Sequence, residues 1–164
     1  MTPEEIIKHF SMCKHPEGGV YAQTYRSAGI IQKAALDGFD GDRVYSTAIV
    51  YLLRQGEYSR LHRIRQDEVW HFYLGHPLRI VEITSDGTQK ETILGQNFAE
   101  GQTLQYVVHA GNWFGATPCA ASAYSFVGCT VAPGFDFADF ELGERTSLLA
   151  KFLASSALIA EFTS

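Results

Sequence analysis

The sequence predicts an all-β domain, either a barrel or a double-sheet jelly roll, with a short helix at each end. Segments rich in β-branched and aromatic residues follow one another, mostly at intervals of roughly 8–12 residues. Turn sequences such as Ser85-Asp86-Gly87-Thr88 separate them. Evenly spaced short strands of this kind are typical of antiparallel barrels and jelly rolls rather than of a βαβ fold.

The first expected element is a helix over residues 3–11, because Thr2-Pro3-Glu4-Glu5 provides an N-cap, a proline at the first helical position and a glutamate at the third. His15-Pro16-Glu17-Gly18-Gly19 then has turn composition. The expected strands cover residues 20–26, 46–53, 58–64, 68–74, 78–84, 90–94, 103–109, 113–117 and 123–131. Residues 145–162 have helical composition, with a packing stripe formed by Leu148, Leu149, Phe152 and Leu153.

Composition limits the class of protein. The 164 residues are 46% hydrophobic and no Pro/Gly/Ser-rich or charged run divides them, so we expect one domain over residues 1–164. A net charge of -5 with scattered Lys and Arg gives no support for a nucleic-acid partner. Residues 1–10 are too polar for a secretory segment and no apolar run approaches the roughly 18 residues of a membrane span, so no membrane partner is expected and the cytoplasm is the expected compartment. Cys13, Cys119 and Cys129 lack metal or redox spacing and are expected to be reduced, packed thiols.

The most informative stretch covers residues 56–75. Strands 58–64 and 68–74 are separated by three residues, which predicts a hairpin with Ile64 opposite Glu68 and His62 opposite Trp70. Side chains alternate along a strand, so His62, Glu68 and Trp70 share one face while His71 points the other way. His62 and Glu68 are then diagonal neighbours with Cα atoms roughly 7–8 Å apart. This spacing suits two metal ligands, or a carboxylate that orients an imidazole.

The pattern Gly56, five residues, His62-x-Ile64, three residues, Glu68, six residues, Gly75 resembles the first motif of the cupin superfamily, with Ile64 in place of the second histidine. Three further segments, HPEGGVY at 15–21, AGNW at 110–113 and VAPGFDF at 131–137, are similar to a small single-domain cupin-type group of unknown function. In fold, that group resembles the dTDP-sugar 3,5-epimerases, and its members form dimers. The resemblance implies a cupin double-stranded β-helix, which is a jelly roll, and a homodimer, but it does not imply an activity.

The second cupin motif is largely missing. His109, Gly111, Phe114 and Pro118 align with its proline, glycine, ligand histidine and asparagine, so only the glycine is kept. Ile64 and Phe114 have no lone pair to offer, whereas a catalytic zinc or iron generally needs three protein ligands. We therefore expect no metal and no other cofactor, unless His76, His109 or a partner chain completes a ligand set.

His62 and Glu68 are the candidate catalytic residues, with the imidazole as general base. The expected ligand-binding residues are the aromatic side chains of Trp70, Phe72, Trp113 and Phe114, together with Tyr21 and Arg26, which could reach across a dimer. An aromatic wall suits a sugar ring or a planar heterocycle. Each residue also has an ordinary structural alternative: a hydrogen-bonded barrel histidine, a buried partner for an arginine, or core packing.

Three functional hypotheses remain open on the sequence. The first is a metal-independent isomerase or epimerase of a small polar metabolite, such as a sugar nucleotide or modified sugar. In it, His62 abstracts a proton next to a carbonyl, and a tyrosine or Glu68 returns one. The second is a ligand-binding or sensing protein without turnover. The third is a metal-dependent enzyme with substitute ligands.

Overall fold

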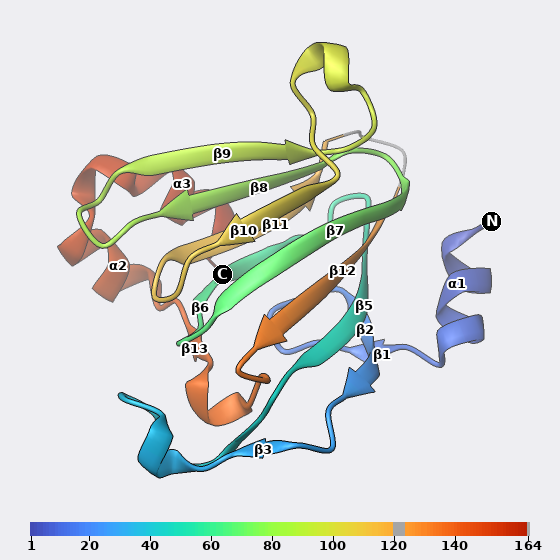
Figure 1. Cartoon of the computed structure of the whole chain (residues 1–164). Coiled ribbons are helices and arrows are strands. Elements are labelled where there is room, and N and C mark those ends of the chain that lie inside the picture. The colour runs from blue at the N-terminus through green and yellow to red at the C-terminus, as the bar shows by residue number, and fades with distance from the viewer. Residues whose placement is uncertain (120–123, 164) are drawn as a thin grey trace.

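Two antiparallel β-sheets face each other in the computed structural model, which describes residues 1–119 and 124–163 (Figure 1). The larger sheet has the strand order β1 (Cys13–Lys14), β2 (Val20–Arg26), β5 (Thr47–Arg54), β12 (Tyr124–Ala132), β7 (Asp67–Gly75) and β10 (Gln105–Val108). The smaller sheet has the order β13 (Glu141–Leu142), β6 (Ser59–Arg63), β11 (Trp113–Pro118), β8 (Leu78–Ile83) and β9 (Gln89–Leu94). A separate pair joins β3 (Ile30–Ile31) to β4 (Arg43–Val44).

The main core lies between the two sheets. Tyr51 of β5 and Trp70 of β7 come from the larger sheet, and Ile80 of β8 and Phe114 of β11 come from the smaller one. All four side chains are at most 1% exposed. The all-β jelly-roll prediction is confirmed, because inward-facing apolar residues of both sheets form one core, as in other β-sandwiches.

Each predicted strand lies within two residues of an observed one. The last predicted strand included Ala123, which lies outside the described residues. The strands that the sequence did not predict, β1, β3, β4 and β13, have two residues each, too few for an alternating pattern to show.

The predicted hairpin of residues 58–74 is wrong. β6 belongs to the smaller sheet and β7 to the larger one, so His62 pairs with Phe114 and Leu142 instead of Trp70. Glu68 pairs with Val108 and Val131. The alternating pattern shows which side chains face inward but not which strand lies alongside. The face of β6 that carries His62 and the face of β7 that carries Glu68 both point into the space between the sheets. His62 and Glu68 therefore still face a common interior.

Helices cover the outer faces of both sheets. α1 (Pro3–Phe10) begins with the predicted capping box, in which Thr2 and Glu5 bond each other's backbone N–H. Its Ile6 packs on Leu52 and Phe126 outside the larger sheet. Short 3-10 helices complete the chain at η1 (Lys33–Ala35), η2 (Phe98–Glu100), η3 (Phe137–Asp139) and η4 (Leu153–Ser155).

The C-terminal helical segment is divided into α2 (Arg145–Lys151) and α3 (Ser156–Phe162). Leu148 and Phe152 pack with Leu61 and Trp113 on the outer face of the smaller sheet. Leu153, however, is 75% exposed, so its predicted packing role is wrong. The backbone leaves the helical conformation at Phe152, with φ -130° and ψ 58°, and this turns Leu153 outward.

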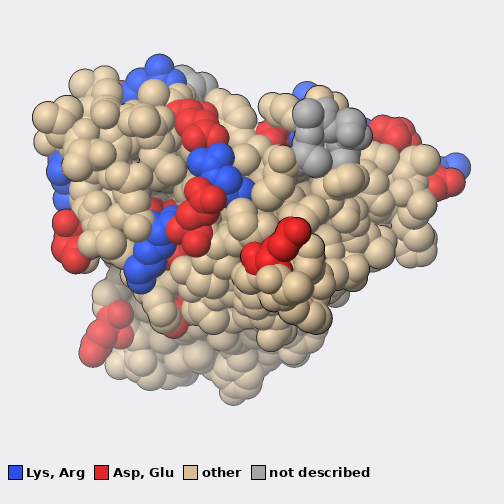
Figure 2. Space-filling model, turned by 90° about the horizontal axis from the view of Figure 1, so that it is seen from above, with Lys and Arg blue, Asp and Glu red and all other residues tan. Residues whose placement is uncertain are grey.

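The surface carries both signs of charge. On the face shown in Figure 2, Lys and Arg side chains lie beside Asp and Glu side chains and do not gather in one basic patch. Arg79, for example, forms ion pairs with both Glu91 and Glu161. The three cysteines are free, but Cys13 and Cys119 are exposed, so only Cys129 is packed as expected. No helix in the described part of the chain is long and apolar enough to span a membrane.

Candidate functional site

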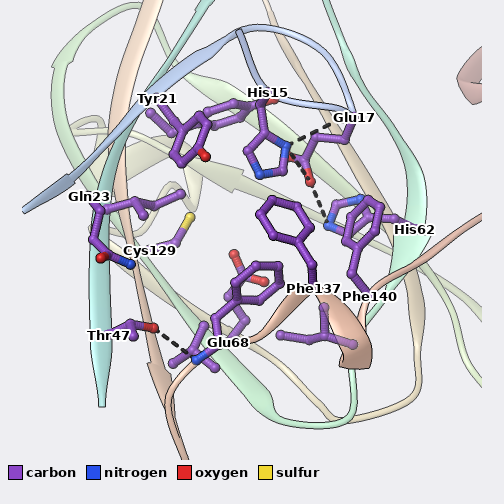
Figure 3. Close-up of a pocket in the computed structure, with 15 residues that line it drawn as sticks. His15, Glu17, Tyr21, Gln23, Thr47, His62, Glu68, Cys129, Phe137 and Phe140 are labelled. Carbon is purple, nitrogen blue, oxygen red and sulfur yellow. Dashed lines mark hydrogen bonds and ion pairs between the residues drawn. The ribbon is translucent and has the colours of Figure 1, made fainter. Parts of the chain in front are cut away.

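A cavity of about 190 Å³ lies against the inner face of the larger sheet (Figure 3). Its polar wall is formed by His15, Glu17, Gln23, Thr47, His62 and Glu68. Its apolar wall includes Ile49, Ile64, Val131, Phe135, Phe137 and Phe140. Residues from both sheets and from the segment after β12 therefore meet at one enclosed site.

The turn between β1 and β2 brings Glu17 into this site. Gly18 and Gly19 have positive φ values of 124° and 64°, a backbone conformation that residues with a side chain rarely adopt. A Cβ atom at Gly18 would lie 2.2 Å from the carbonyl oxygen of Tyr58, so only glycine allows the turn to approach the chain before β6 this closely. The Tyr51 hydroxyl donates a hydrogen bond to the Gly18 carbonyl at 2.8 Å and fixes the turn.

His62 and Glu17 share a proton. The Nδ1 atom of His62 lies 2.7 Å from the carbonyl oxygen of Arg60, which can only accept, so Nδ1 carries hydrogen. The Nε2 atom lies 3.1 Å from Oε2 of Glu17. Both of these atoms are acceptors unless one is protonated, so a proton must lie between them. The buried pair is therefore either imidazolium and carboxylate or imidazole and carboxylic acid, with zero net charge in both cases.

Glu17 is held by two more groups. Its Oε1 accepts a hydrogen bond from the Ser59 hydroxyl at 2.8 Å. Its backbone N–H approaches Nδ1 of His15 at 3.3 Å and its Oε2 lies 3.4 Å from the same atom, so Glu17 is the partner of Nδ1, and Nε2 is left as the second ring nitrogen. Figure 3 shows this second nitrogen of His15 directed toward the cavity. Burial lowers the pKa of His15, which favours the neutral ring.

Glu68 is a carboxylic acid at neutral pH. Burial raises its pKa from 4.5 to about 8, and the negative charge of Glu17 adds to the shift. The thiol of Cys129 is its hydrogen-bonding neighbour, and the two side chains lie side by side in Figure 3. Burial also raises the pKa of Cys129 well above its ordinary value, so the thiol is not an activated nucleophile.

The phenylalanines of the cavity come from the segment after β12. The ring centroid of Phe140 lies 5.3 Å from that of His62, and Phe137 lies 6.1 Å from His15 in a stacked orientation. Phe137 is 51% exposed and closes the cavity toward solvent. The segment is attached by Asp139, which accepts two hydrogen bonds from Arg43 at 2.7 and 2.6 Å.

The structure brings three of the predicted site residues to the cavity, namely His62, Glu68 and Tyr21. The hydrogen-bonding partner predicted for His62 was Glu68, whereas the structure provides Glu17. Arg26 pairs with Thr47 across β2 and β5, but it is exposed and is not among the residues that line the cavity.

The four predicted aromatic residues do not line the cavity. Trp70, Phe72 and Phe114 pack in the core between the sheets, and the Phe114 ring supports His62 from behind at a centroid distance of 4.0 Å. Trp113 faces outward, against the C-terminal helices, with the Arg63 guanidinium 4.7 Å from its ring. Successive residues of a strand point to opposite faces, so Trp113 and Phe114 cannot line the same cavity.

The sequence reasoning missed Glu17, His15 and the phenylalanines at 135, 137 and 140. The segments that carry them, 15–21 and 131–137, stood out as family-like, but HPEGG also has ordinary turn composition. The available signal was a pair of titratable residues beside a glycine pair, because a surface turn needs neither His nor Glu. Their contact with His62 spans more than forty residues, which no local pattern reveals.

The donor set does not fit a transition metal. Ile64 and Phe114 stand where cupin ligands would be, Nδ1 of His62 donates to a carbonyl and Nε2 faces Glu17. His76 and His109 are exposed and lie outside the cavity wall, so they do not complete a set. Within residues 1–119 and 124–163, no group of three or more His, Cys, Asp and Glu side chains is arranged to hold a metal ion.

A jelly roll with a cavity between its sheets defines the chain as a cupin-fold domain. Residues 4–143 match the family model described as Cupin superfamily (DUF985), and the chain belongs to this family. This confirms the predicted membership of a cupin-type group of unknown function. No curated protein matches the chain.

Two similar solved structures extend over the whole chain. A protein of Shewanella oneidensis is 35% identical, with a TM-score of 0.89, and the match covers 100% of this chain and 98% of that one. A hypothetical protein from Leishmania major is 31% identical, with a TM-score of 0.89, and the match covers 99% of both chains. Oxalate decarboxylase from Bacillus subtilis shares the fold alone, at 12% identity and a TM-score of 0.56, over 94% of this chain and 38% of that one.

Proposed function

We propose that the protein is a metal-independent isomerase or epimerase of a small polar metabolite. The observation that carries the proposal is that two proton-transfer groups of different character face one cavity: the Glu68 carboxylic acid and the His62–Glu17 pair. Sites of acid–base catalysis typically contain two titratable groups whose surroundings push their pKa values apart, so that one can donate a proton while the other accepts one. The cavity volume of about 190 Å³ is below the 300–1,000 Å³ typical of drug-sized ligands, which favours a substrate of monosaccharide size.

The chemistry would be proton transfer next to a carbonyl group. The His62–Glu17 pair accepts the proton from the carbon beside the carbonyl, and the C–H electrons form the carbon–carbon double bond of an enol. The carbonyl oxygen takes the Glu68 proton at the same time. The enol O–H then gives its proton back to Glu68 while carbon takes a proton, either from the His62–Glu17 pair or from Tyr21, whose phenolate is reprotonated by that pair, so that every group regains its starting protonation state. Return to the opposite face of the same carbon gives an epimer, and return to the neighbouring carbon gives an isomer.

Hydrogen exchange tests this proposal without knowledge of the natural substrate. The protein is incubated in D₂O with a panel of aldoses, ketoses and sugar lactones, and proton NMR follows the loss of each hydrogen next to a carbonyl. We expect exchange into at least one compound, slowed 100-fold or more in Glu68→Gln and His62→Asn, since general acid–base groups contribute typically 10²–10⁴-fold. His76→Gln, a change of an exposed side chain outside the cavity, is the matched control and should exchange at the wild-type rate.

A second candidate is ligand binding without turnover. The phenylalanine side of the cavity favours it, because aromatic side chains can hold a ring without taking part in chemistry. In the same experiment, a compound that binds but shows no exchange above the buffer rate would support this candidate and contradict the isomerase.

A further inference from the structure

The walls of the cavity carry no fixed positive charge. Among the described residues that line it there is no Lys or Arg, and its nitrogen groups belong to His15, His62 and Gln23. Both histidines lie beside the Glu17 carboxylate, whose Oε2 is 3.1 Å from His62 and 3.4 Å from His15, so a positive charge on His62 is compensated by Glu17. Burial lowers the pKa of His15 and favours its neutral ring. The neighbouring guanidinium of Arg43 is bound to Asp139. A buried anion would therefore lose its hydration without gaining a counter-charge, which is costly.

The groups that remain available are neutral hydrogen-bonding groups. Thr47 accepts the backbone N–H of Phe135 at 3.0 Å, which leaves its hydroxyl hydrogen free to donate. Gln23 provides both an amide donor and an acceptor. Glu68, as a carboxylic acid, donates and accepts as well. Together they match a ligand with carbonyl, hydroxyl or amide groups at its edge.

The apolar walls match the faces of a ring. Ile49 and Val131 come from β5 and β12, and Phe137 and Phe140 come from the segment that follows β12. Figure 3 shows Phe137 and Phe140 across the cavity from Gln23 and Cys129. Strand side chains on one side and aromatic rings on the other suit a compact ring whose polar groups lie at its rim.

We propose that the cavity selects an uncharged, ring-shaped metabolite and rejects its anionic counterparts, so that a sugar phosphate, sugar nucleotide or dicarboxylate is not the substrate. This inference rests on the proposed function only in placing the ligand in the same cavity. It narrows the substrate class to neutral sugars, lactones and neutral heterocycles.

Matched pairs of compounds test the charge preference directly. Nicotinamide and nicotinate, and glucose and glucuronate, have similar size and differ in charge. Their dissociation constants are measured by NMR titration of isotope-labelled protein at pH 7, with Gln23 and Thr47 signals as reporters. We expect a neutral member of at least one pair to bind at least tenfold more tightly than its anion. Equal or tighter binding of the anions would overturn the inference, and so would failure of both neutral compounds to bind.

A variant that adds a positive charge at the cavity provides a second test. Gln23 lies on the exposed part of β2 at the cavity, so Gln23→Arg introduces a cation at little risk to the core. It should reduce the preference for the neutral compounds by about tenfold or reverse it. Gln23→Met removes the amide without adding a charge, so it should weaken both members of a pair alike and keep the ratio of their dissociation constants near the wild-type value. If the wild type binds anions and Arg26→Gln abolishes that binding, Arg26, which pairs with the cavity-lining Thr47, recruits charged ligands and the inference is wrong.

The experiments distinguish failure of the proposed charge preference from failure of the proposed isomerase activity. Anion preference would contradict the substrate class while leaving proton exchange intact. Absence of proton exchange would contradict the isomerase while leaving the measured charge preference intact.

Discussion

Glu68 carries a carboxyl group whose pKa rises from 4.5 to about 8 in the folded protein, chiefly because it is buried. Between these two pH values the folded state holds a proton that the unfolded chain releases. The contribution of Glu68 to the free energy of unfolding is therefore full below about pH 4.5 and is lost as the pH rises toward 8. The loss can reach about 1.4 kcal/mol per pH unit.

Urea unfolding of the wild type and Glu68→Gln at pH 5, 6, 7 and 8 measures this effect. We expect the wild type to lose stability relative to Glu68→Gln as the pH increases. Glu100→Gln, a change of an exposed glutamate outside the cavity, should follow the wild type. Parallel pH profiles for the wild type and Glu68→Gln would show that Glu68 is ionised in the folded protein and is not an acid at neutral pH.

Single residues were predictable where a motif fixed their type and spacing. His62 and Glu68 were found in this way, and both line the cavity. The partner of His62 was not predictable, because Glu17 approaches it only through the fold of the β1–β2 turn. The same applies to Phe137 and Phe140, since an aromatic residue in a loop gives no sign of the cavity that it closes.

The segment between β12 and β13 is the element that closes the cavity, and a buried ion pair attaches it to β4. The Arg43 and Asp139 side chains are 5% and 0% exposed, and Gln66 donates a third hydrogen bond to Asp139 at 2.7 Å. The guanidinium and the Gln66 amide lower the pKa of Asp139 against the effect of burial. Removing one partner leaves the other buried without compensation, which typically costs 3–5 kcal/mol.

Asp139→Asn should therefore lower the free energy of unfolding by about 3 kcal/mol, measured from urea midpoints. The exposed pair Arg63–Glu141 on the adjacent strands is the matched control, and Glu141→Gln should cost less than about 1 kcal/mol. Similar effects of the two substitutions would mean that the buried pair does not hold the segment in place. The double variant Arg43→Met/Asp139→Leu should recover part of the lost stability, because it leaves no unpaired buried charge.

The elements themselves were largely predictable, while their pairing was not. Thr2 and Glu5 specify the start of α1 through a local capping box, and the strands follow from alternating apolar residues. The assumed hairpin of β6 and β7 failed because the three residues between them cross from one sheet to the other. A connection of three residues can join two strands of one hairpin or two strands of different sheets. Only the packing of the remaining strands decides which of the two forms.

At the scale of the molecule, the dimer prediction depends on β2. β2 pairs with β5 on one side, within the larger sheet. On its other edge, β2 is covered only at Val20 and Tyr21, by the two-residue strand β1. Ala22 to Arg26 therefore have no strand partner on this edge in the described part of the chain. An open edge of this kind can pair with the same strand of a second copy.

Light scattering at micromolar concentration should therefore give about 36 kDa, twice the chain mass of 18.2 kDa. Tyr25 is 53% exposed on this edge, and Tyr25→Lys should shift the protein toward the monomer, because lysine opposes edge pairing. Phe98→Lys changes a residue that is 64% exposed on η2, far from β2 in the sheet order, and should leave the dimer intact. A monomeric wild type would contradict the dimer. A dimer lost in Phe98→Lys but kept in Tyr25→Lys would place the interface on the β7–β10 side of the sheet instead, since η2 precedes β10 in the chain.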